Sequence, residues 1–199
     1  MTVCGFTKTG TQPRHKLENM TSMISSRETR DTDNGDLLVW ILAWSELVAF
    51  GALLTAFVVA SALHPETFAA GKARLHHALP VVNTIVLLAS GWFAAKAGEQ
   101  NAISRRRLML LVAALGGVVF AGLKCLEYAF EGASLLSGDP FSQLYLLITG
   151  FHLTHVAFGS MILVLVTVFP TRENVHLITT LWHVIDIVWL VMFPLIYLL

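Results

Sequence analysis

Charged residues are scarce in this chain. Only 13% of its 199 residues are Asp, Glu, Lys or Arg, whereas 55% are hydrophobic. Soluble globular domains carry about 25% charged residues. The composition therefore excludes an ordinary soluble domain and indicates a membrane protein with several spans.

Cysteine and the familiar catalytic motifs are scarce as well. Cys4 lies in a polar stretch and Cys125 in an apolar run, a spacing that predicts neither a disulfide framework nor a metal site. No nucleotide-binding glycine loop is visible. The first 36 residues lack an apolar core near their start, so a cleaved secretory signal is not expected. We interpret residues 1–35 as a disordered cytoplasmic tail and residues 36–199 as a membrane domain.

Long apolar runs are what the chain does have. A helix needs roughly 20 apolar residues to cross a bilayer, and five segments meet that length. They are Leu37–Leu63, Leu79–Ala97, Leu108–Phe130, Leu144–Phe169 and His176–Leu199. A membrane barrel would instead show short segments of alternating polarity. The expected fold class is an all-α membrane protein, a bundle of five transmembrane helices.

The basic residues predict how this bundle is oriented. Ten of the thirteen Lys and Arg residues lie in the N-terminal tail or in the second and fourth connections between spans. Lys72 and Arg74 lie in the first connection, on the opposite side. Because Lys and Arg gather on the cytoplasmic side, we expect a cytoplasmic N-terminus and an external C-terminus. Topology alone explains the cluster Arg105–Arg107, so nucleic acid is not an expected partner.

Ionisable side chains interrupt three of the spans at similar depths. With about 1.5 Å of rise per residue, Glu46 lies about 15 Å inside the first span. The pairs His152/His155 and His183/Asp186 lie at about 10–17 Å inside spans four and five. A buried carboxylate costs about 3 kcal/mol, so it is usually paired or placed on a proton or ligand path. We expect these residues to be neighbours, and both a structural and a functional role for Glu46 stay open.

Further polar residues occur at defined spacings. Each histidine-containing pair has the i,i+3 spacing that places both members on one helix face. Lys124 and Glu127 have the same spacing near the outer end of span three, where pairing would lower the cost of either charge. Asn83, near the outer end of span two, is expected to cap or cross-link helices.

Three functional interpretations fit these residues. The histidines and Asp186 are most simply hydrogen-bonding groups between helices. A proton-conducting or transport bundle would use Glu46 at mid-depth. An intramembrane metalloenzyme would use His152, His155 and His183 with a carboxylate, although a pair of histidines is not a full ligand set.

Five ordered motifs resemble a known family, subunit III of the haem-copper oxidases. The similarity covers about residues 35–199. The motifs are Trp44-Ser45-Glu46-Leu47, Pro80–Gly91 with Asn83, Glu127-Tyr128, Gly150–Gly159 with His152 and His155, and Trp182–Trp189 with His183 and Asp186.

The resemblance implies a non-catalytic accessory subunit that binds no haem, copper or other metal. Such a subunit packs against the catalytic subunit, holds phospholipid and supports proton uptake and stability during turnover. Glu46 matches the family's buried, carbodiimide-reactive glutamate. The positions Glu127, His152, His155, His183 and Asp186 match recurring polar residues with structural or lipid-contact roles.

Two departures from the family refine this expectation. Seven-helix members have two further N-terminal helices that help form a lipid-filled cleft, so such a cleft within this chain is in doubt. The connection between spans four and five is short, about Pro170–Val175. The chain looks especially similar to the NorE-type proteins associated with nitric oxide reductase. The expected partner is oxidase subunit I or the large subunit of nitric oxide reductase, in a bacterial inner membrane.

Overall fold

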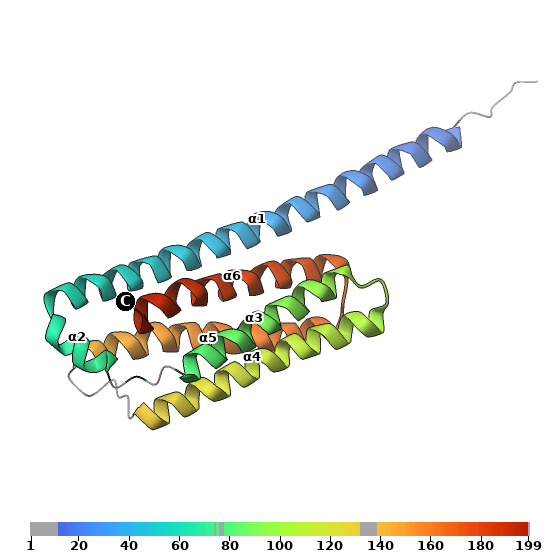
Figure 1. The fold of residues 1–199 in the computed structure, drawn as a ribbon. Helices are drawn as coiled ribbons and strands as arrows, with labels where there is room; N and C mark the ends of the chain where they lie inside the picture. Colours follow the sequence, from blue (N-terminus) through green and yellow to red (C-terminus); the bar gives the residue numbers. More distant parts are fainter. Residues whose placement is uncertain (1–11, 74, 76–77, 132–138, 199) are drawn as a thin grey trace, which may run out of the picture. The chain divides into compact units, whose positions relative to one another are not determined.

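The computed structural model describes residues 12–73, 75, 78–131 and 139–198, and within them the regular elements are all helices (Figure 1). In chain order they are α1 (Gln12–Leu63), α2 (Pro65–Lys72), α3 (Ala78–Glu99), α4 (Ile103–Glu131), α5 (Pro140–Val168) and α6 (Arg172–Tyr197). The chain divides into two compact units, residues 1–38 and residues 39–199. The first unit contributes the beginning of α1, and the second contains all the membrane-spanning segments.

Five helical segments are long and apolar enough to cross a membrane, which confirms the predicted all-α, five-span fold. They are Val39–Leu63, Ala78–Glu99, Ile103–Phe130, Pro140–Val168 and Arg172–Tyr197. The last three begin before the predicted residue, because polar first turns belong to the helices although they lie outside the apolar runs. The inside–outside orientation stays a prediction.

The polar N-terminal stretch differs from the expected disordered tail. Residues 12–35 continue α1 as helix, and the rest of the predicted tail, residues 1–11, lies outside the described residues, as does Arg74. Pro13 is the second residue of α1, where a missing backbone N–H removes no helical hydrogen bond. No further proline or glycine follows before Gly35, so nothing in the sequence interrupts the helix.

Arginines at the start of α4 hold together the ends of three helices. Arg106 donates from Nη2 to the carbonyl oxygen of Gln100 (2.7 Å) and from Nη1 to that of Pro170 (2.8 Å). Arg107 donates to the carbonyl oxygen of Val168 at 3.3 Å. The last carbonyls of a helix have no partner within that helix. Arg106 and Arg107, which helped to predict the orientation of the bundle, therefore also form hydrogen bonds at the ends of α3 and α5.

Helices α3, α4, α5 and α6 form a ring in which each packs against two others, and α2 rests on α5 (Figure 1). Small residues allow the close approach, as is usual for helices in membranes. A Cβ at Gly117 of α4 would lie 2.7 Å from Cη2 of Trp182, and one at Gly159 of α5 would lie 2.9 Å from Cζ3 of the same ring. The fully buried Trp182 therefore fills the centre of the bundle between α4, α5 and α6.

The spanning part of α1 is attached through few side chains. Within Val39–Leu63 the buried apolar residues are Ala43, Phe50 and Phe57. Phe57 packs edge-on against Phe68 of α2, with ring centroids 5.2 Å apart. Most of the remaining side chains on this segment are exposed, so one narrow strip of α1 makes its contacts.

Candidate functional site

Glu46 pairs with a histidine of α5. Its Oε2 lies 3.0 Å from Nε2 of His155, and the two side chains are 18% and 24% exposed. Nδ1 of His155 lies 2.8 Å from the carbonyl oxygen of Phe151, so this nitrogen is the donor. The approach of Nε2 to Oε2 is a close polar contact, although Oε2 has no partner with hydrogen-bond geometry among the described residues. The contact between these two side chains links α1 to α5.

His152 is turned away from Glu46 into the aromatic core. It is fully buried, and its ring stacks on Trp189 with centroids 5.2 Å apart and meets the edge of Phe120 at 5.7 Å. Neither ring nitrogen has a hydrogen-bond partner among the described residues. Phe50 of α1 touches both histidine rings of α5. The structure thus brings Glu46 to one member of the expected histidine pair.

Lys124 and Glu127 form a second polar cluster, fully enclosed in the bundle. Nζ of Lys124 lies 2.8 Å from Oε1 of Glu127, and both side chains are 0% exposed. Lys124 also donates to the hydroxyls of Tyr145 (3.1 Å) and Tyr197 (2.5 Å). Both tyrosines donate in turn to Oε1 of Glu127, at 2.8 and 2.6 Å. We call these four residues the lysine cluster; it connects α4, α5 and α6.

Aromatic rings also lie around the lysine. The ring centroids of Tyr128, Tyr145, Trp189 and Tyr197 lie 5.0–5.6 Å from Nζ, the range of cation–π contacts. The i,i+3 spacing predicts the pairing but not its enclosure. Tyr145 and Tyr197 come from distant helices, and no local pattern connects them with Lys124. The sequence feature that could have predicted these partners is that both tyrosines lie at the same depth in the membrane as Lys124.

His183 and Asp186 form a third pair, at the boundary of α6 and α3. Nδ1 of His183 lies 3.6 Å from Oδ2 of Asp186, and the side chains are 42% and 6% exposed. A Cβ at Gly91 of α3 would overlap Oδ2 of Asp186, so the absence of a side chain there makes room for the carboxylate. The pair contacts α3 and does not join the contact between Glu46 and His155, contrary to the expected grouping on three helices.

Asn83 does not make the expected cross-link. Its side chain is fully buried in α3, but neither amide atom has a hydrogen-bond partner among the described residues. The next residue makes the link instead, since Nε1 of Trp189 donates to Oγ1 of Thr84 at 2.9 Å. The prediction of a polar link between helices at this turn of α3 was correct, but Thr84 makes the link and Asn83 does not.

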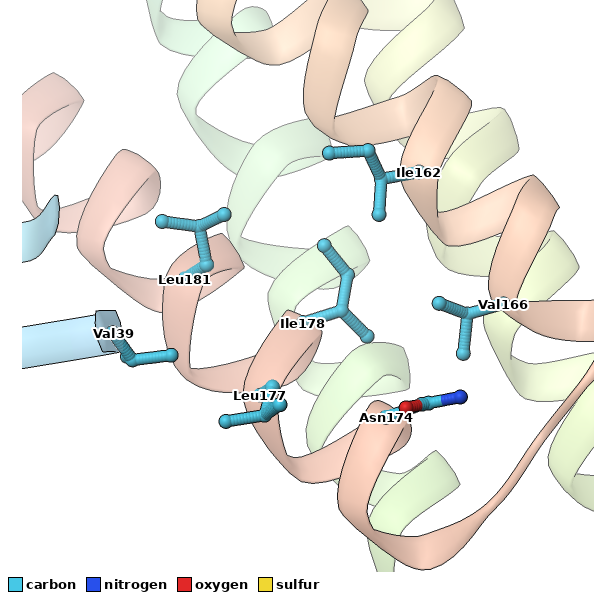
Figure 2. Close-up of a pocket in the computed structure, with 7 residues that line it drawn as sticks. All are labelled: Val39, Ile162, Val166, Asn174, Leu177, Ile178 and Leu181. Carbon is cyan, nitrogen blue, oxygen red and sulfur yellow. The ribbon is translucent and has the colours of Figure 1, made fainter. Parts of the chain in front are cut away.

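An apolar groove lies near the beginning of α6. Its volume is about 230 Å³, and it is lined by α5 residues Ile162 and Val166, by α6 residues Asn174, Leu177, Ile178 and Leu181, and by Val39 of α1 (Figure 2). Figure 2 shows the aliphatic side chains converging, with Asn174 nearest the helix end. Its walls suit a hydrocarbon chain.

The histidines and carboxylates that the structure describes do not assemble into a metal centre. Across residues 12–73, 75, 78–131 and 139–198, no three His, Cys, Asp or Glu side chains converge closely enough to hold an ion. His183 lies with Asp186 against α3, whereas His155 lies with Glu46. The three-histidine arrangement that a metalloenzyme would use is therefore not formed.

The contact between Glu46 and His155 predicts measurable energetic coupling. In a double-mutant cycle of Glu46→Gln and His155→Gln, we expect a coupling of about 0.6–1.7 kcal/mol, between the mean and the maximum found for hydrogen bonds between membrane helices. Unfolding of the four proteins in detergent by SDS titration measures it. As a control, Glu46→Gln should not couple to Thr154→Val, because the Thr154 hydroxyl bonds to Gly150 of its own helix. Additivity in both cycles would contradict the pairing.

Comparison with known proteins identifies the family. Residues 29–199 match the family model described as Cytochrome c oxidase subunit III. The cytochrome c oxidase subunit 3 of Thermostichus vulcanus is 27% identical over 176 residues, covering 82% of this chain and 85% of the relative. That of Synechocystis sp. is 30% identical over 168 residues, covering 78% and 71%. Since the match includes all five spans, the chain belongs to the cytochrome c oxidase subunit III family.

Proposed function

We propose that this chain is a non-catalytic accessory subunit of a haem-copper respiratory complex in a bacterial inner membrane. The observation that carries the proposal is the family match over residues 29–199, which includes every spanning segment. The relatives named above are subunits of cytochrome c oxidase. The chain would pack against the catalytic subunit and support its assembly, stability or proton uptake.

The use of the polar residues supports a structural role. Glu46 with His155 joins α1 to α5, and the lysine cluster joins α4, α5 and α6. Thr84 with Trp189 joins α3 to α6. Polar groups that bond across helices hold a bundle in one arrangement. In this proposal they give the catalytic subunit a defined surface to bind.

The partner in this proposal comes from the nitric oxide reductase branch. Support comes from the short connection between α5 and α6, which is residues 169–171 and resembles the compact NorE-type proteins. The alternative partner is oxidase subunit I. The two differ in the gas that the complex reduces, so activity of the assembly separates them.

A phospholipid acyl chain is the proposed occupant of the groove between α5 and α6. Six of the seven lining residues are aliphatic, and hydrocarbon tails are what such a surface meets in a bilayer. The lipid would help to fix the beginning of α6 without taking part in chemistry.

Purification from native membranes tests the proposal. We expect the tagged chain, extracted in a mild detergent, to retain a catalytic haem-copper subunit, visible as haem absorbance in the eluted complex. Consumption of nitric oxide by that complex would support the NorE-type assignment, and consumption of oxygen alone would favour oxidase subunit I. Repeated isolation of a haem-free monomer from membranes that contain the catalytic subunit would contradict the accessory role.

A further inference from the structure

His183 exposes an ionisable ring near the middle of a membrane-spanning helix. It lies eleven residues after Arg172, the first residue of α6, so about 16 Å along the helix. Its side chain is 42% exposed. Ionisable residues in spans almost always face a bundle interior or a water-filled cavity, because hydrocarbon offers them no hydrogen bonds. This ring does neither within the chain.

Asp186 lies beside this exposed ring. The carboxylate lies one turn further along α6 and faces Nδ1 of His183, so Nε2 is the nitrogen left for an outside partner. Asp186 itself is buried against Gly91, and its Oδ1 has no hydrogen-bond partner among the described residues. The pair is thus only partly satisfied by the chain's own groups.

The surface around His183 is suited to packing against another helix. Thr180 and Ile187 flank it on the same face of α6, and both are exposed. On α3, Trp92 follows Gly91 and is 57% exposed. The hydroxyl of Thr180 already donates to the carbonyl oxygen of His176, so His183 supplies the polar group of this surface that still needs a partner.

Other outward faces of the bundle are different. On α4 the exposed side chains include Leu111, Leu115 and Val118, and on α5 they include Met161 and Leu165. Lipid tails can pack against such aliphatic surfaces, which have no hydrogen-bonding group that needs a partner. The α6 face with Thr180, His183 and Ile187 differs from them, because a lipid tail cannot hydrogen-bond to an imidazole.

We propose that the surface formed by Trp92 of α3 and by Thr180, His183 and Ile187 of α6 is where a transmembrane helix of the catalytic subunit docks. That helix places a hydrogen-bonding side chain against Nε2 of His183 and packs apolar residues on Trp92 and Ile187. The inference rests on the proposed accessory role and adds the surface through which it is exerted.

Photo-crosslinking in native membranes tests this surface. A benzophenone amino acid is placed at Ile187 on the proposed surface, and at Val118 or Met161 on the aliphatic faces of α4 and α5 as controls. We expect illumination to join the Ile187 variant to the catalytic subunit, identified by mass spectrometry of the product, and the controls to give little of that product.

The other outcomes separate the surface from the accessory role. Crosslinking to the catalytic subunit from Val118 or Met161 but not from Ile187 would overturn the surface while leaving the accessory role intact. A crosslink from Ile187 to a second copy of this chain, or to lipid alone, would also overturn it. Failure of every variant and of the unmodified chain to retain the catalytic subunit would count against the accessory role itself.

A steric variant gives an independent readout. Ile187→Trp adds bulk to the surface but leaves His183 and Asp186 in place, whereas replacing His183 would remove the contact of Asp186 and endanger folding. We expect Ile187→Trp to weaken retention of the catalytic subunit by about tenfold or more, while thermal unfolding of the isolated chain stays unchanged. Val118→Trp, the matched control on α4, should retain the partner. Equal retention by both variants would contradict the proposal.

Discussion

Replacing Lys124 with Met is expected to lower the free energy of unfolding by about 3–5 kcal/mol, the usual result of removing one partner from a buried ion pair. Glu127 would keep its place in the bundle without the Lys124 ammonium beside it, and the hydroxyls of Tyr145 and Tyr197 would lose the hydrogen bonds that Lys124 donates to them. Unfolding in detergent, followed by circular dichroism during SDS titration, measures the loss.

Two controls test whether the loss of stability comes from leaving a buried charge without a partner. Lys96 and Glu99 have the same i,i+3 spacing and a 2.7 Å contact, but their side chains are 39% and 64% exposed. Lys96→Met should therefore cost no more than about 1 kcal/mol. The double variant Lys124→Met/Glu127→Gln should regain part of the loss, because no uncompensated charge remains. Equal effects of Lys124→Met and Lys96→Met would show that the cluster is not enclosed.

Gly117→Ala is expected to destabilise the bundle by about 1–3 kcal/mol, the typical cost of overpacking a core. The added methyl group would overlap Oγ of Ser160 and approach Cη2 of Trp182 to 2.7 Å. Both neighbours are buried, so they have little space into which to move. The thermal midpoint in detergent should fall accordingly.

Gly122→Ala is the matched control on the same helix. No atom lies within 4 Å of the position its Cβ would occupy, and alanine is favoured over glycine in a helix by about 1 kcal/mol. We expect this variant to match or exceed the wild-type stability. A similar midpoint for both glycine variants would contradict the close packing of α4 against α5 and α6.

The spans and their helical state could be predicted from the sequence because hydrocarbon leaves a chain few options. An apolar run of sufficient length must bond its backbone internally, and neither tertiary contacts nor neighbours change that. The pairing of Lys124 with Glu127 could also be predicted from the sequence, because residues three apart lie on the same face of a helix.

Which residues from different helices contact one another could not be predicted from the sequence. Depth alone placed Glu46, His155, His183 and Asp186 at similar levels, but depth says nothing of direction around the helix axis. The structure rotates His155 toward α1 and directs Asp186 toward Gly91 of α3. Likewise, the lysine cluster depends on Tyr145 and Tyr197 facing one centre, which only the packing of α4, α5 and α6 decides.

The accessory role is tested most directly by comparing the catalytic complex with and without this chain, at equal haem content. If the chain is an accessory subunit, both preparations should show the same initial rate per haem, and the preparation without the chain should have a shorter active lifetime during turnover. An initial rate abolished at full haem content would assign catalysis to this chain. If both the rate and the active lifetime were unchanged without the chain, the proposed accessory role would be contradicted.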